Sequence, residues 1–470
     1  MTDRDLLEAD RRHWIHPVVN YRAHEQRGAT VLDSARGSFL IDGDGVELLD
    51  AFAGLWCVNV GYGQESVVEA AAAQMRKLPY ATGYFHYGSE PAIRLAEKLV
   101  SIAPKSLTRV YFGAGGGDAI DTAIRLVTNY YNVTGRPSKK HFIALERGYH
   151  GSMAVGSGLT ALAPFHAGFD VPLPTQHHLP SPYPYRHPAG PDPQAVIAAS
   201  VKSLRDKVAE LGADHVAAFF CEPVQGSGGV VMPPVGWLKA MREACRELDI
   251  LFLADEVITG FGRTGPMFAC LAEGVEPDLM TVAKGLTAGY VPMGATLVSE
   301  PIYQALADGI KAGMPMGHGH TYSAHPVAAA VALEVLRLYE EGGILANARR
   351  VAPAFEAGLA ATLAHPLVGD VRTRGLLGAI ELVADKAAKR RFDPSLRLPE
   401  RIAEIAYQRR IVFRCFGDNI LGFAPALNYS EADVALMLER VRLVLDDVLA
   451  LEEVRAALAP ARVAAVAAAG

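Results

Sequence analysis

Two short apolar runs, each ending in one functional side chain, constrain the fold of this chain more than any other feature. Residues 251–254 (Leu-Phe-Leu-Ala) lead into Asp255, and residues 279–283 (Leu-Met-Thr-Val-Ala) lead into Lys284. Apolar runs of this length without alternation are typical of strands buried on both faces of a parallel sheet. Because the carboxyl ends of parallel strands meet at one edge, where ligands bind, we expect Asp255 and Lys284 to face one crevice.

A lysine and a carboxylate at one sheet edge are the pair that pyridoxal phosphate (PLP) requires. The amine attaches the cofactor as a Schiff base, and the carboxylate keeps the pyridine nitrogen protonated. Taken alone, either residue is better explained as a surface lysine or as a helix-capping aspartate. The prediction of a PLP site therefore rests on the pair and on its context.

Helices and short apolar strands alternate from about residue 90 to residue 300. This alternation predicts an α/β fold with a doubly wound, mainly parallel sheet in a large domain. The two chain ends are expected to form a smaller α+β domain. We divide the chain into residues 1–60 (N-terminal part of the small domain), 61–325 (large PLP-binding domain) and 326–470 (C-terminal part of the small domain), with 456–470 as a loose tail.

Composition and charge exclude several other classes of protein. The 470 residues are 50% hydrophobic and 20% charged, with a formal net charge of −6. This mildly acidic balance, without a run rich in Lys and Arg, argues against nucleic acid as a partner. We expect no signal peptide and no membrane-spanning helix, because no apolar run is long enough. Five scattered cysteines without CxxC spacing indicate a reducing compartment, so we expect a cytoplasmic protein without disulfides.

A glycine-rich turn, residues 113–117, lies between the strand Val110–Phe112 and a helical run. Such a turn exposes backbone N–H groups at the positive end of a helix dipole, which suits a phosphate. Asp118 stands where a dinucleotide-binding fingerprint has its third glycine, and no Walker lysine follows the turn. We therefore expect this turn to bind the phosphate of the cofactor.

Six motifs resemble one enzyme family and occur in the family's order. They are Gly54–Trp56, Gly148–Gly151, Glu222–Gly226, Asp255–Gly265, Lys284–Leu286 and His320–Ser323. From about Trp14 to Leu449, the chain resembles the class-III aminotransferases of the ω-amino acid or amine:pyruvate type, a branch of the fold-type-I PLP enzymes. The run that begins Asp-Glu-Val and ends Gly-Phe-Gly-Arg-Thr-Gly, with a lysine close behind, is the most specific part.

The resemblance implies a role for each residue beside the cofactor ring. Lys284 would carry the cofactor and then move a proton between substrate and cofactor, a task suited to a desolvated lysine. Asp255 would pair with the pyridinium nitrogen. Tyr149 would lie against one face of the ring and Val257 against the other. Glu222 is expected beside the cofactor's oxygen or beside a nearby cation.

The resemblance also implies how the phosphate is held. Gly116 and Gly117 would donate backbone N–H groups, and Thr321 would reach the same phosphate from a second subunit, so the active site would require a homodimer. Family members usually have Ser-Gly-Ser-Glu-Ala-Asn where residues 115–120 read Gly-Gly-Gly-Asp-Ala-Ile. The hydroxyl missing at Gly117 costs about 1–3 kcal/mol of phosphate binding if nothing replaces it. Ile120 removes an amide, so weaker cofactor binding is implied.

Four residues are implied in substrate binding. Arg414 aligns with the family's mobile arginine, whose planar fork binds a carboxylate and whose long stem lets it withdraw. Trp56, Tyr84 and Phe85 would line the rest of the pocket. Aromatic walls suit alkyl or aryl amines.

The sequence thus predicts a PLP-dependent transaminase that moves an amino group from a primary amine or ω-amino acid to pyruvate by a ping-pong cycle. An amine donor and a keto acid are its small-molecule partners. Three alternatives stay open: a 2-oxoglutarate-linked enzyme of the ornithine or γ-aminobutyrate type, an aminomutase, and a cofactor-binding protein without turnover. The physiological amine, the stereopreference and the choice between dimer and tetramer are left open. No metal site is expected, because the histidine-rich stretch 318–325 contains no carboxylate or cysteine.

Overall fold

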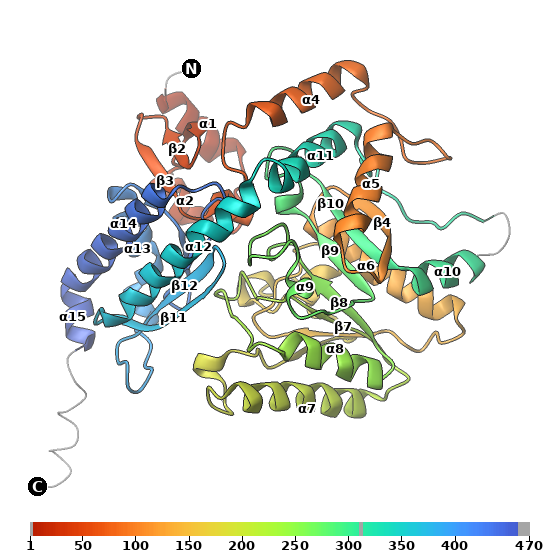
Figure 1. Cartoon of the computed structure of the whole chain (residues 1–470). Helices are drawn as coiled ribbons and strands as arrows, with labels where there is room; N and C mark the ends of the chain where they lie inside the picture. The colour runs from red at the N-terminus through yellow and green to blue at the C-terminus, as the bar shows by residue number, and fades with distance from the viewer. Residues whose placement is uncertain (1–2, 310–313, 459–470) are drawn as a thin grey trace, which may run out of the picture.

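A seven-stranded sheet forms the centre of the larger lobe in the computed structural model, which describes residues 3–309 and 314–458 (Figure 1). All its strands run parallel except β10, which is antiparallel to both neighbours. The expected mainly parallel α/β sheet is therefore confirmed. In spatial order the strands are β4 (Leu107–Gly113), β10 (Gly294–Ser299), β9 (Leu279–Val282), β8 (Leu251–Asp255), β7 (Val216–Cys221), β5 (His141–Leu145) and β6 (Gln176–Leu179).

Helices cover both faces of this sheet, because successive side chains of its strands are apolar on both sides. Phe219 and Phe252 pack into the larger hydrophobic core, to which α5, α7, α8 and α11 contribute. Phe220 and Leu253 point the other way, into a second core with α6 and α10. The helices around this lobe are α4 (Glu65–Lys77), α5 (Glu90–Ile102), α6 (Gly116–Val133), α7 (Pro193–Leu211), α8 (Trp237–Glu247), α9 (Ala269–Ala272), α10 (Glu300–Gly309) and α11 (Pro326–Glu340).

The two chain ends meet in the smaller lobe, at the left of Figure 1. There β3 pairs in parallel with β13, with Leu49 opposite Ile411. One four-stranded sheet consists of β1 (Leu32–Arg36), β2 (Phe39–Asp42), β3 (Glu47–Asp50) and β13 (Ile411–Val412). The other consists of β11 (Val368–Arg374), β12 (Leu377–Leu382), β15 (Ile420–Phe423) and β14 (Arg414–Phe416). The remaining helices are α1 (Asp3–His13), α2 (Tyr21–Arg27), α3 (Ala53–Trp56), α12 (Ile344–Ala361), α13 (Leu398–Gln408), α14 (Glu431–Ala450) and α15 (Glu452–Leu458).

The smaller lobe thus contains segments from both ends of the chain, as the sequence predicts. The division at residues 60 and 325 stays a proposal. The predicted tail, 456–470, begins within α15, and its residues from 459 onward lie outside the described part of the chain.

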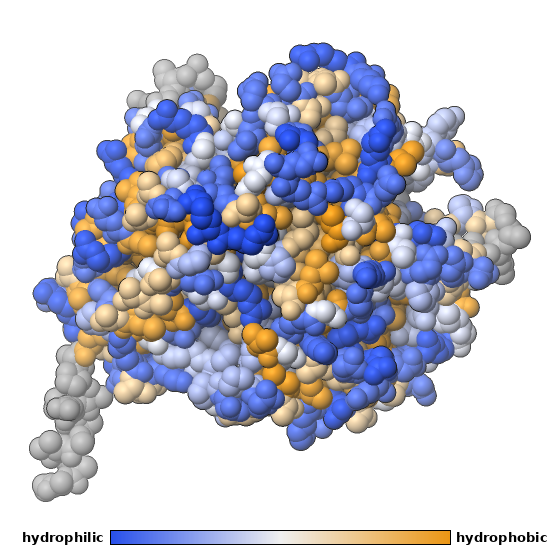
Figure 2. Space-filling model, viewed as in Figure 1, coloured by the Kyte–Doolittle hydropathy of each residue, from blue (hydrophilic) through white to orange (hydrophobic). Residues whose placement is uncertain are grey.

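The distribution of residues on the surface is that of an ordinary globular protein. Figure 2 shows hydrophilic residues over much of one face, with hydrophobic residues gathered in patches between them. Among the described residues, no helix is both long and apolar enough to cross a lipid bilayer. The five cysteines are free thiols.

Candidate active site

Asp255 and Lys284 line one cavity of about 390 Å³ at the carboxyl ends of β8 and β9. Lys284 follows β9 with a backbone φ of 45°, a left-handed conformation that is uncommon outside glycine and concentrates at functional sites. The two side chains therefore share the crevice that their strand positions predict. The cavity is lined by residues 114–118, Ile120, residues 149–153, Asp255, Val257 and Lys284.

The Lys284 amine lies in a desolvated position beneath an aromatic ring. Its Nζ is 4.9 Å from the centroid of the Trp56 ring. Burial lowers the pKa of Lys284 to about 8, although the nearby carboxylates of Glu222 and Asp255 oppose this shift. More of the amine is therefore neutral near pH 7 than for an exposed lysine, which suits a nucleophile or a base.

Three hydrogen bonds fix the Asp255 carboxylate, which is buried. Its Oδ2 lies 2.8 Å from Nδ1 of His150, and its Oδ1 accepts from Oγ1 of Thr281 at 3.0 Å and from the Val257 N–H at 3.1 Å. His150 is also buried. The motif Gly148–Gly151 contains His150, but the sequence predicts no role for this residue. Its position next to Tyr149 is the one local signal for it.

Glu222 supports the turn that carries Tyr149. Its two carboxylate oxygens accept hydrogen bonds from the Tyr149 N–H at 2.9 Å and from the Gly226 N–H at 2.8 Å. Burial raises the pKa of Glu222 to about 7. Tyr149 itself lines the cavity and packs edge-to-face on Phe165 with ring centroids 5.2 Å apart. Glu222 is thereby placed beside the site through backbone contacts.

The N-terminus of α6 opens into the same cavity. The helix begins at Gly116, so its first-turn N–H groups have no partner within the helix and form an anion-binding cradle. A Cβ at Gly116 would lie 3.0 Å from Cγ1 of Val257, so only glycine leaves this approach unstrained. The Asp118 carboxylate accepts from the Ala114 N–H at 2.8 Å and thereby holds the turn.

Comparison with known proteins identifies the enzyme family that has this arrangement. Residues 21–445 match the family described as Aminotransferase class-III.

This chain is a class-III aminotransferase.

Three relatives illustrate the similarity. A diaminobutyrate–2-oxoglutarate transaminase from Halomonas elongata is 39% identical over 441 residues, covering 92% of this chain and 94% of the relative. A putrescine–pyruvate aminotransferase from Pseudomonas aeruginosa is 38% identical over 440 residues, covering 93% and 95%. The crystal structure of an (S)-enantioselective ω-transaminase from Thermomicrobium roseum has a TM-score of 0.92 at 36% identity, covering 96% of this chain and 99% of that one.

Class-III aminotransferases depend on PLP, and the cavity fits this cofactor. It combines a lysine of lowered pKa, a buried carboxylate with fixed orientation and a helix N-terminus suited to phosphate. When bound, PLP supplies an electron sink for transfer of the amino group. The recognition of the family and of its cofactor from the sequence is thus confirmed.

The glycine-rich turn before α6 is closed by a methionine side chain. A Cβ at Gly117 would lie 3.0 Å from Cγ and 3.2 Å from Sδ of Met153. Ile120, the second departure from the family pattern, is buried in the core beneath α6 and also lines the cavity. Apolar groups therefore lie at both positions where the sequence departs from the pattern that the resemblance implies.

Replacing Gly117 with serine is expected to tighten PLP binding by about 10-fold, because a hydrogen bond to a charged group contributes about 1.5–3 kcal/mol. Part of this gain is offset because the Met153 side chain must turn away. Titration of the apoenzyme with PLP measures the effect. Gly117→Ala is the control, since it adds the Cβ without the hydroxyl. Equal tightening by alanine would show that the missing hydroxyl is not what limits affinity.

A row of three side chains leads from the Lys284 amine toward the surface. The Trp56 ring, beside Nζ, stacks on Phe416 with centroids 6.2 Å apart. The Arg414 guanidinium lies 5.8 Å from the centroid of Phe416, on the exposed first residue of β14. Phe416 thus lies between Trp56 and Arg414, although the sequence alone predicts no role for Phe416.

Tyr84, Phe85 and Thr321, like Trp56 and Arg414, are not among the residues that line the Lys284 cavity in this chain. Tyr84 and Phe85 line a separate cavity of about 640 Å³, and Phe85 is 81% exposed. Thr321 is exposed, and its carbonyl accepts a hydrogen bond from the Tyr80 hydroxyl at 3.0 Å. The roles predicted for these three residues therefore stay predictions.

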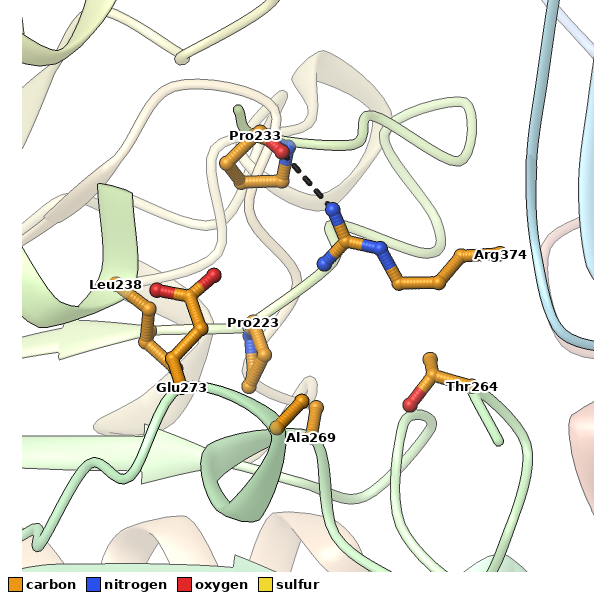
Figure 3. A pocket seen from close by; sticks show the side chains of 8 residues that line it. Pro223, Pro233, Leu238, Thr264, Ala269, Glu273 and Arg374 are labelled. Atoms are coloured by element: carbon orange, nitrogen blue, oxygen red, sulfur yellow. Dashed lines mark hydrogen bonds between the residues drawn. The ribbon is translucent and has the colours of Figure 1, made fainter. Parts of the chain in front are cut away.

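A third, smaller cavity carries no substrate site (Figure 3). Arg374 donates a hydrogen bond of 3.0 Å to the Pro233 carbonyl at its edge. The volume of this cavity is about 30 Å³, enough for about one or two water molecules. It is lined by Pro223, Pro233, Leu238, Thr264, Ala269, Ala272, Glu273 and Arg374.

Proposed function

We propose that this class-III aminotransferase transfers the amino group of a primary amine or ω-amino acid to pyruvate. The products are an aldehyde or ketone and alanine, formed by a ping-pong cycle in one site. The observation that carries this proposal is the row from Lys284 through Trp56 and Phe416 to Arg414. Trp56 and Phe416 form an aromatic wall beside the Lys284 amine. The exposed Arg414 guanidinium lies at the outer end of this row.

The roles of the cofactor residues belong to the same proposal. Lys284 holds PLP and moves a proton between the substrate carbon and the cofactor, which its lowered pKa supports. Asp255 pairs with the ring nitrogen, held in place by His150 and Thr281. Gly116 and Gly117 donate N–H groups to the phosphate. Tyr149 and Val257 enclose the ring, and Glu222 holds the Tyr149 turn.

Arg414 accounts for the acceptance of both substrates in one site. A keto acid with one carboxylate needs one cation, and a guanidinium binds a carboxylate through two parallel hydrogen bonds. When an uncharged alkyl or aryl group enters instead, the exposed arginine withdraws into solvent and the aromatic wall remains. The second carboxylate of 2-oxoglutarate would meet this wall without a second cation, because Arg414 is the one cation of the row.

The relatives support transamination with either acceptor. The P. aeruginosa enzyme is named for putrescine and pyruvate, whereas the H. elongata enzyme, at similar identity, is named for diaminobutyrate and 2-oxoglutarate. A 2-oxoglutarate-linked enzyme is therefore the second candidate.

A half-reaction distinguishes the two acceptors. The enzyme is first converted to its amine-loaded form with a primary amine, and pyruvate or 2-oxoglutarate is then added at equal concentration. We expect pyruvate to restore the original cofactor absorbance at least about 10-fold faster, since an unpaired charge in an apolar pocket costs more than about 1.4 kcal/mol. Faster recovery with 2-oxoglutarate would establish the second candidate. Interconversion of one substrate without a keto acid would indicate an aminomutase.

Replacing Arg414 with alanine is expected to weaken the keto-acid half-reaction by about 100-fold, the scale of a lost charge-assisted bidentate contact. The half-reaction with a simple alkyl amine should change by less than about 3-fold, because no carboxylate is bound there. Rapid-mixing absorbance measurements give both rates. Equal damage to both halves would contradict the proposed role of this arginine.

We also propose that two chains form the active sites together. Large hydrophobic side chains are exposed near Thr321, and the aromatic members of this group are Tyr80, Tyr84, Phe85, Tyr87 and Tyr322. Tyr80 and Tyr322 lie together, with ring centroids 6.3 Å apart. Exposed aromatic groups of this kind mark interaction surfaces. A second copy covering them would bring Thr321, Tyr84 and Phe85 to the partner's cavity.

Light scattering of the purified holoenzyme measures the assembly. A mass of twice the 50.2 kDa of one chain, or a multiple of that dimer, supports the proposal. A catalytically active monomer would contradict it.

A further inference from the structure

The N-terminal segment contains a carboxylate with two imidazoles directed at it. Oδ1 of Asp10 lies 2.5 Å from Nε2 of His16, and Oδ2 lies 2.9 Å from Nε2 of His24. Asp10 belongs to α1, His24 belongs to α2, and His16 lies on the connection between them. The three ligand atoms are all within 4.8 Å of one another.

The burial pattern of this segment is the reverse of an ordinary amphipathic one. Between residues 11 and 27, His16 and His24 are the only residues that are not exposed, while Trp14 and Ile15 are 63% and 77% exposed. No side chain of α2 is buried, so the helix has no apolar core of its own. The polar cluster therefore joins α1 to α2, in a segment too small to be held by hydrophobic burial.

We propose that Asp10, His16 and His24 bind one divalent transition-metal ion of the zinc type. Two imidazole nitrogens and one carboxylate oxygen are ligands that zinc accepts, and water would take the fourth tetrahedral position. The site is separate from the PLP cavity, whose lining includes none of these residues.

Two of the three ligand pairs are close to the spacing that the ion requires. Tetrahedral ligands about 2.0–2.1 Å from zinc lie about 3.3 Å apart, so the hydrogen-bonded atoms separate by less than about 1 Å. Both histidines already present Nε2 to the carboxylate, and the Trp14 ring packs on His16 with centroids 4.1 Å apart.

Binding of the ion would contribute folding energy to a segment that lacks a core. Metal ligation can replace hydrophobic burial in small units, because the ion crosslinks elements that do not pack on one another. Here it would join α1, the connection and α2. The function that we infer is therefore structural: holding α1, the connection and α2 together as one unit.

Metal titration of the untagged holoenzyme tests the proposal. The protein is treated with a chelator, desalted and titrated with Zn²⁺ by calorimetry, and with Co²⁺ while the visible d–d absorbance is recorded. His24→Gln and Asp10→Asn each remove one ligand. His13→Gln is the matched control, because His13 is an exposed histidine on the same segment. The absorbance of bound PLP verifies that each variant is folded.

We expect one Zn²⁺ per chain in the wild type and in His13→Gln, and at least about 100-fold weaker binding in His24→Gln and Asp10→Asn. The Co²⁺ spectrum of the wild type should show a tetrahedral site with nitrogen ligands. No stoichiometric binding by the wild type would overturn the proposal and leave the cluster as a hydrogen-bonded network. Binding of equal strength by His24→Gln would also overturn it, because the ion would then be held elsewhere.

Discussion

Replacing Lys284 with alanine is expected to abolish transamination, with a loss of about 10⁵-fold or more, the scale found when an enzyme loses its nucleophile. The same variant should lose the visible absorbance of lysine-bound cofactor, because Lys284 carries the only amine among the described residues that line the cavity. Both effects follow from one cause, the removal of the desolvated amine beneath Trp56. Steady-state rates and an absorbance spectrum of the purified variant measure them.

The rate and the absorbance spectrum together distinguish loss of the covalent bond to the cofactor from loss of the fold. Lys284→Ala should still bind PLP without a covalent bond, since the helix N-terminus and Asp255 are unchanged. Near-normal transamination in this variant would contradict the assignment of Lys284.

Replacing Asp255 with asparagine is expected to lower the rate by about 10³-fold, because a neutral partner no longer stabilises charge on the cofactor ring. The lysine-bound absorbance should remain, since Lys284 is intact. Asp255→Asn should therefore keep the absorbance spectrum and lose the rate, whereas Lys284→Ala should lose both. Single-turnover measurement with an amine donor gives the chemical rate directly.

Thr281→Val is the matched control for Asp255. It removes one of two hydrogen bonds to Oδ1 while the Val257 N–H remains on the same oxygen. We expect a loss of less than about 10-fold. If Asp255→Asn were no worse than this control, the carboxylate charge would not be required.

The sheet and the central pair were predictable because both depend on local patterns. Unbroken apolar runs of strand length indicate burial on two faces, and Phe219 and Phe220 do pack into opposite cores. Because β8 and β9 are parallel, Asp255 and Lys284 lie at one edge of the sheet, independently of the conformation of the connecting loops. The family motifs indicated the same cofactor as the Asp255 and Lys284 pair, and the motif residues Tyr149 and Val257 line the cavity.

Other parts of the site depend on packing between distant segments, which no local pattern encodes. His150 and Asp255 are 105 residues apart in sequence, and their hydrogen bond arises only from the fold. Met153 fills the space beside Gly117 for the same reason. The roles of Tyr84, Phe85 and Thr321 stay predictions, because in one chain these residues do not line the Lys284 cavity.

The N-terminal cluster shows another limit of sequence reading. Asp10, His16 and His24 follow no regular spacing, and the segment that carries them has no buried residue between positions 11 and 27. Their convergence depends on the turn between α1 and α2. Histidines that the sequence does bring together, at 318 and 320, instead pack on Tyr111 and on each other.

Reduction of the holoenzyme with borohydride, followed by peptide mass mapping, tests the central assignment most directly. Borohydride makes the bond between PLP and its lysine permanent, so the modified residue can be read from the peptide. The account predicts the pyridoxyl group on Lys284 in the wild type and no modified lysine in Lys284→Ala. A pyridoxyl group on any other lysine of the wild type would contradict it.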